Sequence, residues 1–177
     1  IGLKSTVIEV LYPFLEKVGI LWQSGDVYPA QEHFVTFLIR KKIIAATDRI
    51  SKPFNPEGKK FLLFLPEGEW HEIALLFAQY LIVEANHEVI YLGQSVPYSD
   101  ALAIGASKKF DYILISCSNS KPGFEIGLYL KELGVAFPDK KVPYFSSFKT
   151  ELPEEASQNL IYLHLIDDLT DFIQDIS

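Results

Sequence analysis

The sequence predicts an α/β fold in which a doubly wound parallel sheet follows a truncated helical-bundle cap. From residue 59 onward, short strands that are apolar on both faces alternate with helical patterns, as in a parallel sheet covered by helices on both sides. Before residue 54, apolar residues recur only at helical spacing. We therefore expect a helical cap, a partial four-helix bundle, at residues 1–54 and a flavodoxin- or Rossmann-like domain at residues 59–177.

Two helices account for the predicted cap. Apolar residues from Leu3 to Val18 recur every three or four positions, and Pro13 is where this helix would bend. A second helix is expected from Pro29 to Ala46, because proline suits a first helical turn and the apolar stripe continues behind it. The stretch "DRISKPFNPEGKK" follows, and its prolines and glycine predict a linker.

The second domain contains five predicted strands and four predicted helices. The strands are expected at residues 60–65, 88–93, 112–117, 142–147 and 160–163, and the helices at 70–85, 99–109, 123–133 and 165–176. Pro143 has no amide hydrogen, which places it on an edge strand or at the beginning of a strand. The apolar sequence "FLLFLPEGEW", residues 61–70, also suggests a surface for self-association.

Composition and charge argue against several classes of protein. A net charge of −7 argues against binding of this segment to the phosphate backbone of a nucleic acid. Its one cysteine, Cys117, cannot form an internal disulfide, so we expect a reducing, cytoplasmic environment. The most apolar helix, residues 73–85, is too short to span a bilayer. Because the chain begins with Ile1, we expect a fragment that lacks an N-terminal segment.

Ligands of open α/β sheets bind beyond the carboxyl ends of the strands, and the loops there contain neither G-x-G-x-x-G nor a Walker sequence. The first loop carries Glu69-Trp70-His71 instead. A carboxylate two positions before an imidazole can accept its Nδ1 proton, which leaves Nε2 available as a base or a metal ligand. A histidine that merely caps a helix is the alternative. No self-contained nucleophile, base and oxyanion site is present, so we do not expect an enzyme.

This arrangement resembles the cobalamin-binding domains that hold the cofactor through a histidine below cobalt. Their pattern is D/E-x-H-x-x-G, about 41 residues, S-x-L, about 27 residues, and G-G. The corresponding residues here, at matching spacing, are Glu69, His71, Ala74, Ser116, Ser118, Ser146 and Ser147. The resemblance implies that His71 is the axial ligand of cobalt and that Glu69 orients it. The polar residues around Ser116 and Ser118 are candidates for binding the cofactor's amide or phosphate groups.

The helical part resembles the cap of light- and cobalamin-sensing transcription regulators of the MerR family. Trp22, nine intervening residues and Glu32-His33 reproduce the W-x9-E-H pattern of that cap. The resemblance implies that these side chains cover the upper face of cobalamin, bound between cap and α/β domain. Corrinoid carriers of methyltransferases resemble the second domain and usually lack this motif. Gln23 stands where some members have a histidine ligand, which puts light-driven bis-histidine chemistry in doubt.

The resemblance implies a ligand-sensing and oligomerising region that binds adenosyl- or methylcobalamin. DNA would be bound by an N-terminal winged-helix domain outside this chain, and the protein would form a homo-oligomer. Three small positions depart from the pattern, since Ala74 and Ser146-Ser147 replace glycines that line the slot for the nucleotide tail. Extra atoms in a tight slot cost on the order of 1–3 kcal/mol. A degenerate sensor that no longer binds cobalamin and a corrinoid carrier of a methyltransferase therefore remain alternatives.

Overall fold

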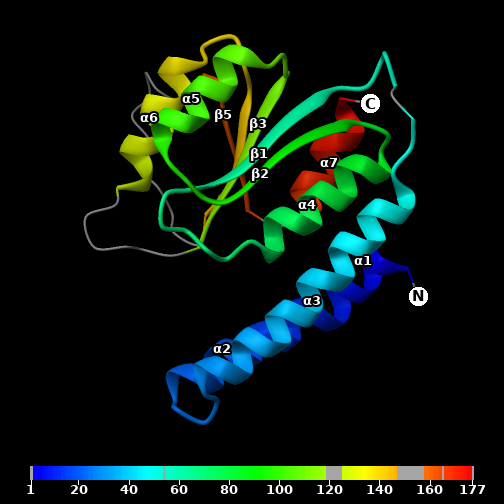
Figure 1. Cartoon of the computed structure of the whole chain (residues 1–177), viewed down its shortest axis with the longest axis vertical. Coiled ribbons are helices and arrows are strands. Elements are labelled where there is room, and N and C mark those ends of the chain that lie inside the picture. The colour runs from blue at the N-terminus through cyan, green and yellow to red at the C-terminus, as the bar shows by residue number, and fades with distance from the viewer. Residues whose placement is uncertain (1, 54, 119–124, 147–157, 165, 177) are drawn as a thin grey trace. The chain divides into compact units, whose positions relative to one another are not determined.

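The computed structural model describes residues 2–53, 55–118, 125–146, 158–164 and 166–176. The chain divides into two compact units, residues 1–51 and residues 52–177. The first unit is helical, and the second contains a five-stranded sheet with helices on its two faces (Figure 1). This is the predicted α/β fold with helices preceding it.

The first unit is a helical hairpin. It begins with α1 (Leu3–Thr6), continues through a π-helical turn (Val7–Leu11) into α2 (Tyr12–Gln23), and returns as α3 (Pro29–Ile50). The π-helical turn ends two residues before Pro13, where the sequence predicts a bend. The α3 helix begins where predicted, with the Gln31 side chain accepting a 2.9 Å hydrogen bond from the Tyr28 amide, and it ends four residues later than predicted.

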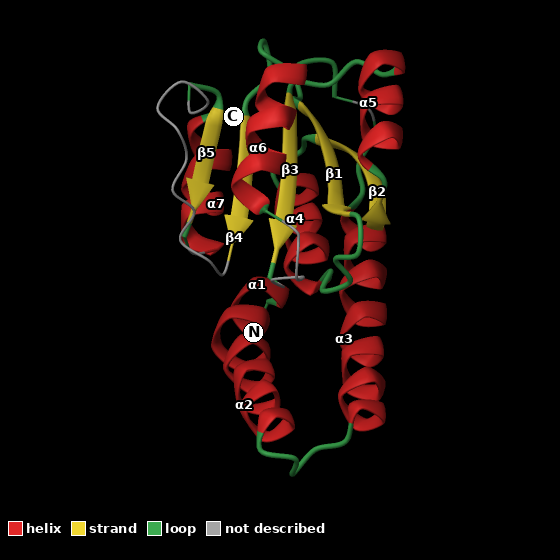
Figure 2. Cartoon of the chain, turned by 90° about the vertical axis from the view of Figure 1, so that its left-hand side faces the viewer, coloured by secondary structure: helices red, strands yellow, loops and turns green. Residues whose placement is uncertain are grey.

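The sheet of the second unit is parallel throughout, as the arrows in Figure 2 show. Its strands are β1 (Lys60–Pro66), β2 (Glu88–Val96), β3 (Tyr112–Cys117), β4 (Val142–Ser146) and β5 (Leu160–Leu163), in the order β2-β1-β3-β4-β5. This flavodoxin-like order reverses between β1 and β3, so the loops that follow these two strands meet at the switch point. All five strands were predicted, although β2 runs three residues further than expected.

Helices cover both faces of this sheet. They are α4 (Ile73–Glu84), α5 (Tyr98–Ser107), α6 (Ile126–Ala136) and α7 (Ile166–Asp175). The α5 and α6 helices pack on one face, where Leu130 and Leu133 join strand residues in a buried cluster. The α4 and α7 helices lie on the other face and contact each other (Figure 1). The four predicted helices are confirmed, with ends that differ by up to three residues.

One prediction about the strands is wrong, and another holds in one of its two forms. The apolar stretch beginning at Phe61 does not provide an exposed surface for self-association, because residues 61–66 are all buried inside the sheet. Pro143 was expected on an edge strand or at the beginning of a strand, and β4 is not an edge strand because it lies between β3 and β5. Pro143 instead occupies the second position of its strand, the alternative that the sequence left open.

Candidate functional site

The candidate site lies where the loops after β1 and β3 meet. The β1 strand ends at Pro66, and the loop that follows carries Glu69 and His71 before α4 begins at Ile73. The β3 strand ends at Cys117, and Ser118 follows it. The backbone amide of Ser118 donates a 2.8 Å hydrogen bond to Glu69 Oε2. Residues 49 positions apart in sequence are thereby joined at the switch point.

Glu69 is a buried carboxylate surrounded by donors. Its side chain is 4% exposed. The amides of Trp70 and His71 donate to Oε1 at 2.8 and 2.9 Å, while the Ser118 amide donates to Oε2. A buried carboxylate is stable only when its oxygens are satisfied in this way. The Glu69 side chain therefore has one fixed orientation.

The His71 imidazole is held by the same carboxylate. Its Nδ1 lies 2.6 Å from Glu69 Oε1, which is the hydrogen bond predicted from their spacing. Because an ionised carboxylate can only accept, Nδ1 donates, and the neutral ring then carries its lone pair on Nε2. The His71 side chain is 62% exposed. The arrangement presents an oriented imidazole nitrogen that can bind a metal centre.

The end of β2 holds the backbone of this loop, a feature that the sequence did not predict. The Ser95 hydroxyl oxygen accepts a 3.0 Å hydrogen bond from the Gly68 amide, and the Ser95 amide donates 3.1 Å to the Glu69 carbonyl. The Gln94 side chain donates 2.7 Å to the Trp70 carbonyl. We call Gln94 and Ser95 the β2 clamp. Three consecutive loop residues are therefore bound by two adjacent residues of another strand.

A second buried carboxylate follows His71. Glu72 is 3% exposed, and its Oε2 accepts a 3.0 Å hydrogen bond from the Tyr91 hydroxyl of β2. Glu72 occupies the N-cap position of α4, where a negative charge is favourable. Tyr91 and Glu72 thus join β2 to the first turn of α4. Neither residue belongs to the motif, so sequence spacing gave no signal for either.

The other residues of the predicted α/β site lie around the same end of the sheet. Ser116 is buried within β3, opposite Phe145 of β4. Ala74 is half-buried in the first turn of α4, and Ser146 is half-buried at the last position of β4. Ser147 lies outside the described residues.

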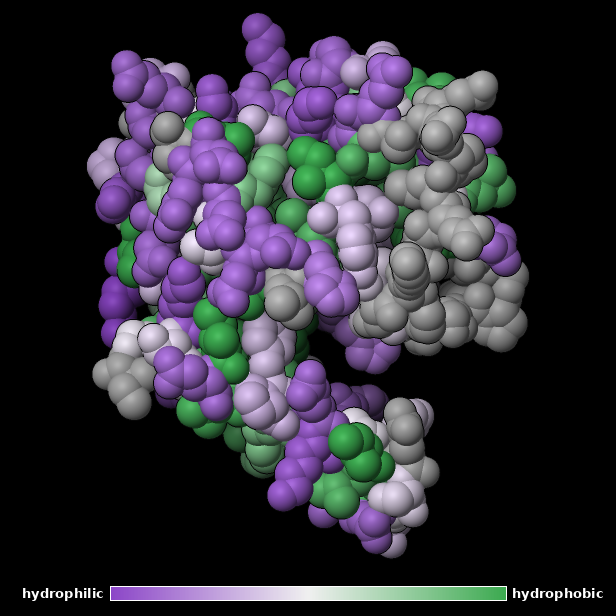
Figure 3. All heavy atoms as spheres, turned by 180° about the vertical axis from the view of Figure 1, so that it is seen from behind, coloured by the Kyte–Doolittle hydropathy of each residue, from purple (hydrophilic) through white to green (hydrophobic). Residues whose placement is uncertain are grey.

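The predicted cap residues lie close to the turn of the helical hairpin. Trp22 is 52% exposed near the end of α2, while Glu32 and His33 occupy the beginning of α3. His33 Nε2 is 3.6 Å from Glu32 Oε2, and the Thr36 hydroxyl donates 2.8 Å to Glu32 Oε1. Apolar side chains are visible on the surface at this end of the hairpin (Figure 3).

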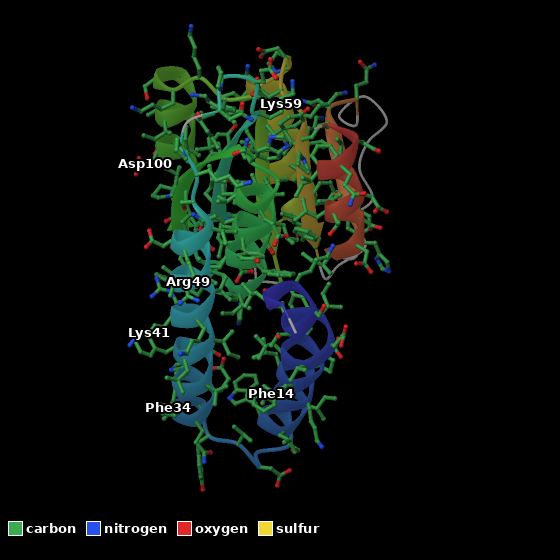
Figure 4. All side chains as sticks on the ribbon, turned by 90° about the vertical axis from the view of Figure 1, so that its right-hand side faces the viewer. Phe14, Phe34, Lys41, Arg49, Lys59 and Asp100 are labelled. Atoms are coloured by element: carbon green, nitrogen blue, oxygen red, sulfur yellow. The ribbon has the colours of Figure 1, made fainter. Side chains whose placement is uncertain are left out.

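Exposed aromatic residues continue along the hairpin. Phe14 of α2 and Phe34 of α3 are 42% and 64% exposed, whereas Lys41 extends away from α3 (Figure 4). Trp22, Glu32 and His33 thus lie near the turn between α2 and α3, and exposed apolar side chains lie on the same two helices. Flat apolar ligands are bound by surfaces of this composition.

The one oriented imidazole of this site fits a cobalt ion that is already bound in a macrocycle. In the part of the chain that the structure describes, no three histidine, cysteine or acidic side chains gather to hold a bare metal ion. A corrin ring itself supplies four nitrogen ligands to cobalt, so a single imidazole nitrogen, such as Nε2 of His71, would suffice as the protein ligand. Within the same described residues, no helix has the length and apolar character needed to cross a membrane.

Sequence comparison links the helical unit to a known family. Residues 3–46 match the family described as the B12 binding domain. The chain is also 31% identical over 130 residues to the HTH-type transcriptional repressor CarH of Myxococcus xanthus. That match covers 73% of this chain and 42% of the repressor, so the chain spans less than half of its relative's length.

Solved structures with the same fold include corrinoid proteins. The Methanosarcina barkeri monomethylamine corrinoid protein aligns with 100% of this chain and 85% of its own, with a TM-score of 0.75 and 14% identity. A cobalamin-binding protein from Desulfitobacterium hafniense DCB-2 aligns with 92% of this chain and 78% of its own, with a TM-score of 0.53 and 20% identity. At these identities the likeness concerns the fold.

The comparisons and the motifs point in the same direction. The helical unit matches a B12 binding domain, and a transcriptional repressor is similar to most of the chain. The resemblance predicted from the motifs is thereby confirmed: this chain is similar to the cobalamin-binding effector region of transcription regulators.

Proposed function

We propose that this chain is the ligand-sensing and oligomerising region of a MerR-type transcription regulator that binds a corrinoid. The observation that carries the proposal is the His71 imidazole, oriented by the buried Glu69 carboxylate at the sheet's switch point. The similarity to a transcriptional repressor supports a regulator in preference to a methyl carrier. In this proposal the chain senses its ligand and catalyses no reaction.

His71 would hold the lower face of the corrinoid through Nε2, and Glu69 would retain the proton on Nδ1. Trp22, Glu32 and His33 would cover the upper face, as the cap motif implies. Ser116 and Ser118 are candidates for contacts with the cofactor's polar groups. When bound, adenosyl- or methylcobalamin supplies a cobalt centre with an upper ligand that can be exchanged.

The regulatory step would be a shift in population. A ligand that contacts both units binds best to the arrangement that presents both sets of residues, so it stabilises that arrangement. Subunit association would change with it, and a DNA-binding domain elsewhere in the cytoplasmic protein would respond. The 42% coverage of the repressor is compatible with DNA recognition by another part of the protein.

Cobalamin titration tests this proposal directly. Cofactor-free protein is mixed with methylcobalamin in the dark, and bound cofactor is followed by its visible spectrum after gel filtration. We expect methylcobalamin to coelute with the protein. Methylcobinamide, which has no nucleotide base of its own, should show a nitrogen-ligated spectrum with the unmodified protein and lose it in His71→Ala. His164→Ala is the matched control, because His164 is an exposed histidine at the end of β5. If neither methyl- nor adenosylcobalamin coelutes with the unmodified protein, the proposal is wrong.

A degenerate sensor is the second candidate function. It is favoured by the side chains at Ala74 and Ser146, which are half-buried at positions where the family pattern has glycine. The triple variant Ala74→Gly, Ser146→Gly, Ser147→Gly distinguishes the two. Cobalamin uptake by the triple variant alone would favour the degenerate sensor, whereas uptake by the unmodified protein would exclude it.

A further inference from the structure

The backbone of the loop before His71 is fixed from outside the loop. The Gly68 amide, the Glu69 carbonyl and the Trp70 carbonyl are all bound by the β2 clamp, at distances between 2.7 and 3.1 Å. The Glu69 side chain fixes the imidazole but originates from the same loop. The Ser118 amide holds the Glu69 carboxylate from the neighbouring loop but does not bind the backbone, so the orientation of the backbone must be fixed by another element.

The β2 clamp reaches the loop because β2 is irregular at its end. Relative to β1, the register shifts once between Tyr91 and Gly93 and again between Gly93 and Val96. Each shift adds one residue to β2, which bends the strand and redirects its side chains. The irregular segment ends beside the loop that begins after Pro66, the residue paired with Val96.

Ser95 adopts a backbone conformation that most residues avoid. Its φ is +50°, in the left-handed region, and its loop partner Gly68 has a φ of +80°. A non-glycine residue persists in this region only where its surroundings hold it, and such residues cluster at functional sites. Glycine would adopt the same φ more readily, but it has no hydroxyl to accept the Gly68 amide. Ser95 therefore supplies a hydrogen-bond acceptor at a position where glycine would adopt the backbone conformation at lower cost.

We propose that Gln94 and Ser95 are positioning residues that hold the His71 loop in the orientation required for axial ligation of the corrinoid. This inference rests on the proposed function and names a part of the site that the motif omits. Ligand residues need support from a surrounding shell, because a displacement of about 1 Å is enough to weaken coordination. Glu69 provides this support for the ring, and the β2 clamp provides it for the backbone.

Three variants separate the contributions of the β2 clamp. Ser95→Gly keeps the left-handed conformation and removes the acceptor, while Ser95→Asn tolerates that conformation and restores an acceptor oxygen. Gln94→Ala removes the bond to the Trp70 carbonyl. Ser99→Ala is the matched control, because Ser99 is an exposed serine whose hydroxyl bonds only the neighbouring Asp100 among the hydrogen bonds of the described residues.

The first measurement is the visible spectrum, at saturating protein, of bound methylcobinamide, a corrinoid that has no nucleotide base of its own to ligate cobalt. We expect Ser95→Gly and Gln94→Ala to lower the nitrogen-ligated fraction by about twofold or more, and Ser95→Asn and Ser99→Ala to retain it. Melting temperatures are recorded in parallel, because a purely structural role would change these without changing the ligation spectrum. A fully nitrogen-ligated spectrum in both Ser95→Gly and Gln94→Ala would overturn the inference.

The second measurement needs no cofactor and keeps the two proposals distinguishable. Amide hydrogen exchange is followed at Gly68, Trp70 and His71 in the cofactor-free protein. We expect exchange at all three amides to quicken by about fivefold or more in Ser95→Gly but not in Ser99→Ala, because the whole loop is released. Acceleration confined to Gly68 would refute the inference even if cobalamin binds. Failure of the unmodified protein to bind cobalamin, with accelerated exchange at all three amides, would refute only the proposed function.

Discussion

Glu69 Oε1 and His71 Nδ1 lie 2.6 Å apart, and the carboxylate is buried while the imidazole remains largely exposed. The buried partner fixes the proton on Nδ1, and the exposed partner presents Nε2. Loss of the Glu69 charge should therefore impair the ability of His71 to bind a metal centre.

Glu69→Gln is expected to weaken methylcobalamin binding by about 10–100-fold, the usual effect of losing the group that orients a metal ligand. It also places a side-chain amide against backbone amides, which costs about 1–3 kcal/mol of unfolding free energy. Titration by visible absorption and denaturant unfolding measure the two effects. Glu67→Gln, on an exposed residue of the same loop, serves as the control. Equal affinity in both variants would contradict the orienting role.

The two tryptophans allow the cofactor to be located. Trp22 and Trp70 are the only tryptophans in the chain, one in each unit, and both are more than half exposed. A corrin absorbs light where indole emits, so a nearby bound corrin removes most of the fluorescence. We expect strong quenching by cobalamin in both Trp22→Phe and Trp70→Phe. Unquenched Trp22 emission in the Trp70→Phe protein would rule out the cap assignment.

His87 gives the fold a predictable pH dependence. Its pKa is lowered, first by burial and second by the charge of Lys59, and its Nδ1 accepts a hydrogen bond from the Lys59 amide. The folded state therefore favours the neutral ring. The resulting stabilisation is complete above the unfolded pKa of about 6.5, and it is lost as pH falls from there to the folded pKa.

We expect the free energy of unfolding to decrease between pH 7.5 and pH 5.5, and this decrease to be smaller in His87→Gln. Denaturant titrations at the two pH values measure it. Ser99→Ala, on an exposed residue that does not titrate in this range, is expected to keep the full decrease. Identical pH dependence in all three proteins would show that His87 does not contribute.

Alanine substitutions at two helical glycines are expected to change the stability of the protein in opposite directions. A Cβ added at Gly105 in α5 would overlap the Phe137 ring, which packs edge-on against the buried Phe110. A Cβ at Gly19 in α2 would meet nothing within 4 Å. We expect Gly105→Ala to destabilise the protein by about 1–3 kcal/mol and Gly19→Ala to stabilise it by about 0.5–1 kcal/mol. Melting curves of the two variants provide the test, and stabilisation in both would show that the Phe137 ring moves aside.

Local patterns in the sequence predicted most of the fold. The strands read as short apolar runs, and the Glu69–His71 hydrogen bond followed from a two-residue spacing. The exposed apolar surface expected at residues 61–70 was wrong for its first six residues, because a strand covered by helices on both faces must be apolar throughout. The sequence of such a strand does not distinguish an interface from a core.

The β2 clamp escaped the sequence analysis for a different reason. The predicted strand ended at residue 93, whereas β2 continues through two bulges to Val96. The Ser95 hydroxyl accepts a hydrogen bond from Gly68, 27 positions earlier in the sequence. Serine is not a residue type that indicates a left-handed φ, so the sequence did not predict this conformation. Contacts of this kind depend on strand register, which one sequence does not specify.

The same bulges bear on how copies of this protein can associate. The β2 strand is one border of the sheet, and regular border strands can extend into a neighbouring molecule's sheet through their open backbone groups. Two irregularities in its second half interrupt that ladder, and the opposite border, β5, is only four residues long. Both borders thus discourage continuous pairing between the sheets of two molecules.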